Sequence, residues 1–160
     1  MLDHNFPGDY TDDYSETYLQ QILAEVKTIA LVGASAKSER DSYLTMQALL
    51  QFGYTVIPVN PFEAGNKILG QHCHCTLTDI QQSVDMVDIF RSSAVTLAIT
   101  DEAIAIGAQV VWMQLGIINQ QACDRATAAG LKVVMNRCPK LELTNSCWPT
   151  TYPNSTTINR

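Results

Sequence analysis

The stretch "IALVGASAKSERDS" joins an apolar run to a loop of the kind that holds phosphate groups. Between a strand and a helix, such a loop offers backbone N–H groups and the positive end of the helix dipole. Gly33 allows a sharp turn and a close approach to a ligand, and Ser35 and Ser38 supply hydroxyl donors where a G-x-G-x-x-G loop has its later glycines. Lys37 and Arg40 add positive charge. We predict a phosphate site here, with an ordinary strand-to-helix turn as the alternative.

The end of the second predicted strand bears on which nucleotide would fit. Domains that bind NAD place an acidic side chain about 20 or more residues after the glycine loop, where it holds the ribose hydroxyls. This strand ends in "PVNP", which puts the neutral Asn60 in that neighbourhood. A neutral residue tolerates a phosphorylated ribose, as in NADP or in coenzyme A (CoA) with its 3′-phosphate. An ordinary strand-ending turn at Asn60 and Pro61 stays open as the alternative.

Two polar residues follow other predicted strands. Arg91 comes directly after the apolar residues 86–90, and Gln114 comes directly after residues 110–113. Ligands of open α/β sheets collect at the carboxyl ends of parallel strands, so both side chains are candidate ligand contacts. A solvated strand end is the alternative for Arg91. Trp112, inside the strand before Gln114, is expected in the core.

The run "QHCHC" is the main competing site, because histidine and cysteine at this density suggest zinc. In a strand, however, His72 and His74 face one side while Cys73 and Cys75 face the other, so four ligands cannot converge on one ion. The alternation also lacks the two-residue spacer of structural zinc motifs. We therefore expect an edge strand of the nucleotide-binding sheet and no metal site.

A cysteine and two aspartates could be reactive, but each also has a structural explanation. Cys138, which precedes a proline, is a candidate reactive thiol, although cysteines of this kind commonly serve as small buried hydrophobes. Asp85 and Asp88 lie three positions apart in a strand. They are therefore expected to face opposite sides of the sheet and not to form a carboxylate pair.

The elements that must position these residues follow a repeated pattern. Continuous apolar runs, typical of strands covered on both faces, lie at residues 28–32, 55–59, 86–90, 110–113 and 132–135. Gly53, Gly107 and Gly130 each end a predicted helix directly before a strand. Residues 15–26 predict an N-terminal helix, whereas "VTLAIT" within 93–107 fits a helix or a strand. The pattern predicts a single Rossmann-like, doubly wound α/β domain with a mostly parallel sheet of five to six strands.

Composition and charge restrict the classes of protein that fit. The 160 residues, 46% of them hydrophobic, correspond to one domain, and the net charge of −6 disfavours binding to nucleic acid. Neither a signal peptide nor an apolar run of about 18 residues is readable, which predicts a cytoplasmic protein without a membrane span. The five cysteines, an odd number, favour reduced thiols. We divide the chain into an acidic leader (1–14), a nucleotide-binding domain (15–143) and a polar tail (144–160).

Several motifs, in order along the chain, resemble those of one family. They are "IALVGAS", "GYTVIPVNP", "ILG", "VDMVDIFR", "AIAIGAQVVWMQLGIIN", "AAGLKVVM" and "RCPKLE". Together they span roughly residues 22–143 and resemble the small CoA-binding protein family, which is related to the nucleotide-binding N-terminal domain of the succinyl-CoA synthetase α subunit. The resemblance implies a Rossmann-like domain that binds CoA or an acyl-CoA through the loop after its first strand.

The resemblance also implies which residues contact the ligand. Those expected to line its phosphates are Gly33, Ala34, Ser35, Ser38 and Arg40. Those expected around the adenosine are Asn60 and Pro61, with Phe90 and Arg91 closing the site. Those expected along the path of the pantetheine arm are Gln114 and Gly116.

The chain departs from the family pattern at two positions. Asp41 stands where proline is common, and its carboxylate would oppose a phosphate unless it caps the helix or pairs with Lys37 or Arg40. Asn136 stands where aspartate is usual, which leaves the polar role of that position open.

The leading functional hypothesis is non-catalytic binding of CoA or an acyl-CoA. In the related synthetase a further domain and a partner subunit supply the catalytic machinery, so ligase activity is not expected of this chain. The alternative enzyme is a small NADP-dependent or CoA-thiol redox protein that uses Cys138. A regulatory module that docks on a partner enzyme, or a homo-oligomer, also stays open.

Overall fold

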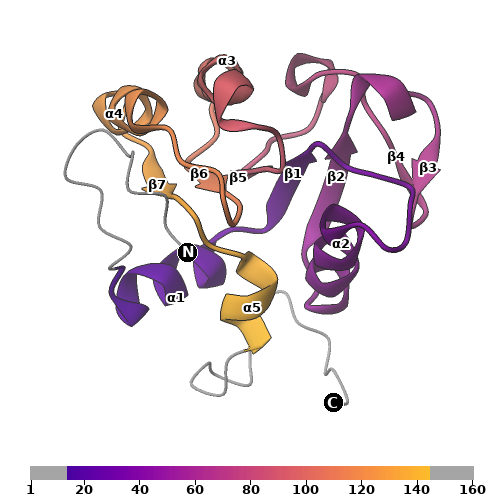
Figure 1. Cartoon of the computed structure of the whole chain (residues 1–160), viewed down its shortest axis with the longest axis horizontal. Helices are drawn as coiled ribbons and strands as arrows, with labels where there is room; N and C mark the ends of the chain where they lie inside the picture. The colour runs from indigo at the N-terminus through magenta and orange to yellow at the C-terminus, as the bar shows by residue number, and fades with distance from the viewer. Residues whose placement is uncertain (1–13, 145–160) are drawn as a thin grey trace.

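The apolar runs of the sequence form the strands of one parallel sheet, in the part of the chain that the computed structural model describes, residues 14–144 (Figure 1). The strands are β1 (Thr28–Val32), β2 (Thr55–Val59), β5 (Met86–Ile89), β6 (Val110–Met113) and β7 (Lys132–Val134), in the spatial order β2-β1-β5-β6-β7. Every neighbouring pair in this sheet is parallel. The predicted Rossmann-like fold is therefore confirmed.

Helices cover both faces of the sheet (Figure 1). One face is covered by α1 (Glu16–Glu25), α2 (Asp41–Gln51) and α5 (Pro139–Thr144), and the other by α3 (Ser93–Ala105) and α4 (Gln120–Ala128). On the first face Leu23 of α1 and Leu49 of α2 pack in one cluster with Leu31 and Trp112 of the sheet. Trp112 is fully buried, which confirms its predicted place in the core.

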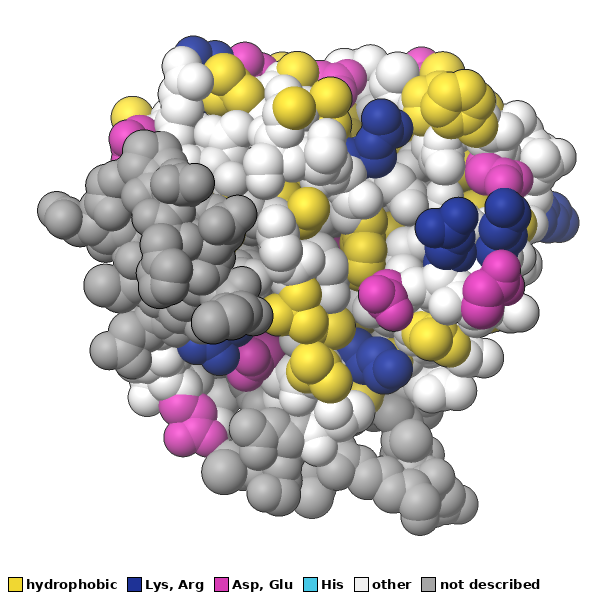
Figure 2. Space-filling model, in the orientation of Figure 1, with side chains coloured by type: hydrophobic (Ala, Val, Ile, Leu, Met, Phe, Trp, Pro, Cys, Tyr) yellow, Lys and Arg dark blue, Asp and Glu magenta, His cyan; other side chains and the backbone are white. Residues whose placement is uncertain are grey.

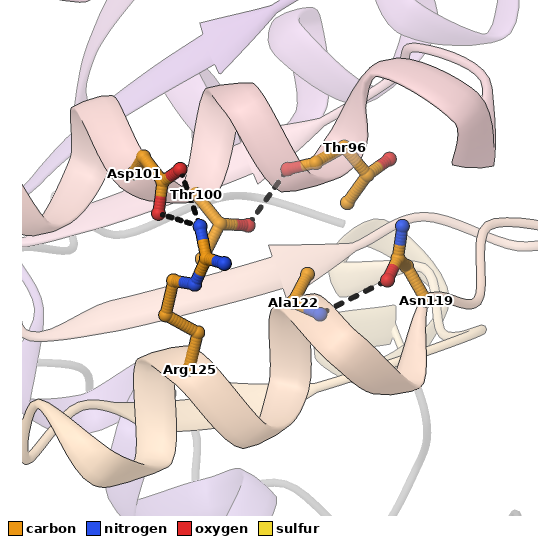
Figure 3. A network of polar contacts seen from close by, with 6 residues as sticks. All are labelled: Thr96, Thr100, Asp101, Asn119, Ala122 and Arg125. Atoms are coloured by element: carbon orange, nitrogen blue, oxygen red, sulfur yellow. Dashed lines mark hydrogen bonds and ion pairs between the residues drawn. The ribbon is translucent and has the colours of Figure 1, made fainter.

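The segment that fitted both a helix and a strand is the helix α3. Its two buried threonines satisfy their hydroxyls within the helix, because Thr96 Oγ1 donates to the Ser92 carbonyl at 2.9 Å and Thr100 Oγ1 donates to the Thr96 carbonyl at 2.8 Å. Asp101 of α3 also pairs with Arg125 of α4 across 2.7 Å (Figure 3). These contacts satisfy the two threonine hydroxyls within α3 and join α3 to its neighbour α4.

Glycines end three of the helices where the sequence predicted. Gly53, Gly107 and Gly130 follow α2, α3 and α4 with φ angles of 93°, 81° and 89°. Ser15 is the N-cap residue of α1, and its hydroxyl accepts the Tyr18 N–H at 3.1 Å. Within the described residues, no helix is long and apolar enough to cross a membrane.

The prediction that "QHCHC" forms an edge strand of the main sheet is wrong. Residues of this run form β4 (Gln71–His72), which pairs antiparallel with β3 (Lys67–Ile68) in a separate two-stranded sheet. The Cys73 N–H donates to the Asn66 carbonyl at 2.8 Å, which extends the pairing of this hairpin beyond β4. Only His74 reaches the main sheet, through a single parallel bridge to Val59.

The same run has no metal-site geometry. The His72 and His74 rings meet edge to face at 4.9 Å, while Cys73 is buried and Cys75 is exposed. Among residues 14–144, no three histidine, cysteine or acidic side chains are grouped in a way that could hold a metal ion. Short 3-10 turns on either side, Pro61–Glu63 and Leu77–Asp79, connect this region to the main sheet.

Candidate ligand-binding site

Three hollows follow the carboxyl ends of the parallel strands. The loop hollow, about 360 Å³, is lined by residues that include Gly33, Ser35, Lys37, Arg40, Asn60 and Phe90. The α5 hollow, about 260 Å³, is lined by residues that include Thr45, Phe90, Gln114, Cys138 and Leu141. The α3 hollow, about 180 Å³, is lined by residues that include Gly33, Pro61, Leu77, Arg91, Val95 and Ile99. Neighbouring hollows share residues, since Gly33 borders the loop and α3 hollows and Phe90 borders the loop and α5 hollows.

The structure brings most of the predicted site residues to these hollows. The loop hollow takes Gly33, Ala34, Ser35, Arg40, Asn60 and Phe90, the α3 hollow takes Pro61 and Arg91, and the α5 hollow takes Gln114. Two predicted residues, Ser38 and Gly116, are exposed and do not line any of the three. The Gly116 N–H instead donates to Asn136 Oδ1 at 2.7 Å, so the polar role of Asn136 is to hold the turn after β6.

Gly33 is required by the packing of the loop against the end of β5. Its φ angle is +90°, and a Cβ atom there would lie 3.0 Å from the Phe90 carbonyl oxygen and 3.1 Å from Arg91 Cδ. The Gly33 N–H donates to the Val59 carbonyl at 2.9 Å, and the Ala34 N–H donates to the same oxygen at 3.4 Å. These two N–H groups are therefore already used by the fold, which the sequence did not indicate.

The positive end of α2 borders the loop hollow. Asp41 and Ser42, the first residues of this helix, line the hollow, and the N-cap residue Arg40 makes no capping hydrogen bond with its side chain. The Ser35 hydroxyl accepts the Lys37 N–H at 3.1 Å, which leaves its own hydrogen free to donate. This helix end attracts an anion because its dipole is positive there.

Charged side chains of both signs surround this helix end, with the exposed carboxylate of Glu39 beside Arg40 and that of Asp41 in the first turn. Lys37 and Arg40 are exposed, and no ion pair involves either of them within the described part of the chain. Asp41 is exposed in the first turn of α2 and makes neither of the ion pairs that the sequence left open. On the face drawn in Figure 2, basic and acidic side chains both lie around a partly apolar centre. Of the charged side chains that line the loop hollow itself, Lys37 and Arg40 are positive and Asp41 is negative.

Asn60 ties the end of β2 to the loop after β1. Its Nδ2 donates to the Ala34 carbonyl at 2.8 Å, and its Oδ1 accepts the Phe62 N–H at 2.9 Å. The side chain thus serves as a turn residue and as a support for the loop, and it also borders the loop hollow. The turn interpretation of Asn60 is therefore confirmed, and its contact with a nucleotide stays a prediction.

The α5 hollow has a polar floor and an apolar rim. Gln114 is only 6% exposed, and its Oε1 has no hydrogen-bond partner in the described residues. Cys138 Sγ lies 3.8 Å from Thr45 Oγ1, and both side chains are buried. Exposed leucines form the rim, and they are Leu44, Leu115 and Leu141. Sequence reasoning missed Leu44 and Thr45, although their spacing from Asp41 places all three on one face of a helix.

Asp88 is a buried acid in the middle of the sheet. It pairs in register with Leu31 on one side and Trp112 on the other, and neither of its carboxylate oxygens has a hydrogen-bond partner among the described residues. Burial raises the pKa of Asp88 well above its ordinary value, because the charged form is poorly solvated there. Asp85 has a different role, since its Oδ2 accepts the N–H groups of Lys27 and Thr28, both at 2.9 Å. The two acids do not form a pair.

Comparison with known proteins identifies the family. A model of the CoA binding domain matches residues 27–144. The chain belongs to the CoA-binding domain family. This membership confirms the resemblance seen in the sequence motifs.

Relatives of this CoA-binding domain agree with the fold. YneT of Bacillus subtilis (strain 168) is 32% identical over 127 residues, which cover 79% of this chain and 93% of YneT. A solved structure of a protein from Pyrococcus horikoshii OT3 is 39% identical, with a TM-score of 0.77, and the match covers 88% of this chain and 96% of that one.

A larger enzyme contains the same fold. The dinucleotide-forming acetyl-coenzyme A synthetase 1 of Ca. Korarchaeum cryptofilum has a TM-score of 0.60 and 21% identity to this CoA-binding domain. The match covers 77% of this chain but 27% of the synthetase chain. At this identity the likeness concerns the fold alone.

Proposed function

We propose that this chain binds CoA or an acyl-CoA across the three hollows and does not catalyse a reaction on it. The observation that carries the proposal is the loop hollow, where the positive end of α2 lies beside two cations, Lys37 and Arg40, that make no ion pair with any described residue. A diphosphate is the ligand group that such a helix end and such cations fit. Membership of the CoA-binding domain family makes CoA the first candidate.

The α3 hollow suits the adenosine end of such a ligand. Its walls are mainly apolar side chains, among them Leu77, Val95 and Ile99, and adenine has the flat apolar faces that such walls accept. Arg91 lies half-buried at the same hollow. Its guanidinium would hold the 3′-phosphate by charge-assisted hydrogen bonds.

The α5 hollow suits the pantetheine arm. Phe90 lines both this hollow and the loop hollow, so an arm that leaves the phosphates passes directly into it. The unpartnered Oε1 of Gln114 would accept an N–H from one of the amides of the arm. The apolar rim would cover the methylene groups of the arm.

The arrangement around Cys138 favours binding over catalysis. An activated cysteine nucleophile needs a base within hydrogen-bond reach, and the contact of Cys138 Sγ is the hydroxyl of Thr45 at 3.8 Å. A threonine hydroxyl does not act as a base at neutral pH. The proposal therefore contains no reaction step.

Calorimetric titration of the full chain with four ligands tests the proposal. We expect CoA to bind more tightly than 3′-dephospho-CoA, and both to bind more tightly than NADP or NAD. Tighter binding of NADP than of CoA would refute the proposal. Equal affinity for CoA and its dephospho form would remove the role given to Arg91 while leaving the rest.

A further inference from the structure

The α5 hollow contains a buried thiol that the proposed function does not use. Cys138 is 6% exposed and lines this hollow. Among the described residues, its sulfur has a long polar contact of 3.8 Å with Thr45 Oγ1. The thiol is thus shielded from bulk solvent but faces a cavity that a ligand can enter.

A second and independent observation indicates that a ligand enters this cavity. Gln114, which directly follows β6 and lines the same hollow, is also 6% exposed, and its Oε1 has no partner in the described part of the chain. A buried acceptor left without a hydrogen bond costs about 1–3 kcal/mol, so such atoms are usually satisfied by a ligand or water. A donor-bearing chain that reaches Gln114 therefore comes to the same cavity as the sulfur of Cys138.

The chemistry of CoA matches both features of the cavity. This step rests on the proposed function, which places the pantetheine arm in the α5 hollow. That arm carries amide N–H groups along its length and a thiol at its end. We propose that Cys138 is a site of reversible modification, at which its sulfur forms a mixed disulfide with the thiol end of the bound arm.

CoA disulfide supplies the oxidising equivalent for this modification. The Cys138 thiol gives up its proton, its sulfur attacks one sulfur of the CoA disulfide, a bond forms between Sγ and that sulfur, and the original S–S bond breaks. The second CoA leaves as a thiolate and takes up a proton. One disulfide is consumed and one is formed, so no further oxidant is needed.

The other cysteines of the described residues differ from Cys138 in ways that an experiment can use. Cys75 is exposed, and an unselective reagent would reach it first. Cys123 on α4 is half-buried away from the three hollows, and burial raises the pKa of its thiol. Cys73 is buried, and burial likewise raises the pKa of its thiol. Selective reaction at Cys138 would therefore follow from recognition of the reagent and not from exposure.

The test compares CoA disulfide with glutathione disulfide as reagents for the full-length protein. Peptide mapping by mass spectrometry measures the rate of labelling at each cysteine, and it separates Cys138 from Cys147, which lies outside the described residues. We expect CoA disulfide to label Cys138 at least about tenfold faster than glutathione disulfide does, because binding places the two sulfurs together. The label should be removed by dithiothreitol. Labelling at Cys123 should show no such preference.

Two results would overturn the inference. One is the absence of a CoA adduct on Cys138, and the other is an equal rate of labelling there by both disulfides. The variant Gln114→Leu should slow labelling of Cys138 by CoA disulfide, whereas the control Cys123→Ser should leave it unchanged. Equal rates in wild type and Gln114→Leu would contradict the part assigned to Gln114.

Titration with reduced CoA, in the presence of a reductant, separates this inference from the proposed function. If reduced CoA binds the wild-type protein and Cys138 stays unlabelled, only the inference about the disulfide fails. If reduced CoA does not bind, both fail.

Discussion

Two effects make Gly33 necessary, its left-handed backbone and the close packing around it, and comparing Gly33→Ala with Gly65→Ala separates them. The φ angle of +90° is unfavourable for any residue with a Cβ atom, and that atom would also lie 3.0 Å from the Phe90 carbonyl oxygen. Gly65 offers a matched control, because its φ angle is +88° and nothing lies within 4 Å of a Cβ atom built there. Gly65→Ala thus introduces the backbone strain without the collision.

The expected magnitudes follow from these two environments. A left-handed backbone costs an alanine about 1–2 kcal/mol, which is the whole effect expected for Gly65→Ala. At Gly33 the added Cβ atom would contact the backbone of Phe90, directly after β5, and rotation of a side chain cannot relieve that contact. Overpacking therefore adds about 1–3 kcal/mol to the loss of stability. We therefore expect Gly33→Ala to lower the free energy of unfolding by about 2–5 kcal/mol.

Denaturant unfolding followed by circular dichroism measures both variants. A shift of the midpoint at constant slope reports a change in stability alone. Titration with CoA should also show weaker binding by Gly33→Ala than by Gly65→Ala, because the displaced loop borders the loop hollow. If the two variants lose the same stability, the reasoning about the collision at Phe90 is refuted.

Three further substitutions test the charges of the site and the buried acid. In calorimetric titration, Arg40→Gln should weaken CoA binding about tenfold, which is the low end for the loss of a charge-assisted hydrogen bond because the side chain is exposed. The control Arg125→Gln, on α4, should leave the affinity for CoA unchanged. Asp41→Asn should strengthen binding about two- to fivefold by removing repulsion of a phosphate, and weaker binding would mean that the carboxylate helps to hold the ligand. Since the pKa of Asp88 is raised in the folded state, the folded protein binds more protons than the unfolded one, and stability falls as the pH rises from about 4 toward the folded pKa. Asp88→Asn should flatten this decline in denaturant unfolding at a series of pH values, and an unchanged pH dependence would contradict a buried, protonated Asp88.

Much of the fold could be predicted because its signals are local. A continuous apolar run such as 110–113 must be covered on both faces, and a glycine such as Gly107 ends a helix before the strand that follows. Short connections then leave few topologies besides a parallel sheet with helices on both faces. The segment 93–107 lacked a decisive local signal, and it became a helix in a context where the hydroxyls of Thr96 and Thr100 bond to preceding carbonyls.

The edge of the sheet was harder to predict, because hydrogen bonds between distant segments decide it. The run "QHCHC" alternates like a strand, yet backbone contacts such as the Cys73 N–H to the Asn66 carbonyl place it in a hairpin. No pattern within five residues contains that information. Asn60 is a second example, because its Nδ2 donates to the Ala34 carbonyl, 26 residues away in the sequence.

The sequence by itself determined which residues are candidates for a nucleotide site, since Gly33, Arg91 and Gln114 each follow an apolar strand and Arg40 lies in the loop after the first one. Only the tertiary structure decided how they divide among three hollows, that the N–H groups of Gly33 and Ala34 are taken by Val59, and that Thr45 meets Cys138 from 93 residues away. The physical reason is the distance along the chain over which each signal acts. Periodicity and turn chemistry act over a few neighbours, whereas a cavity and its unpaired groups exist only where distant segments pack together.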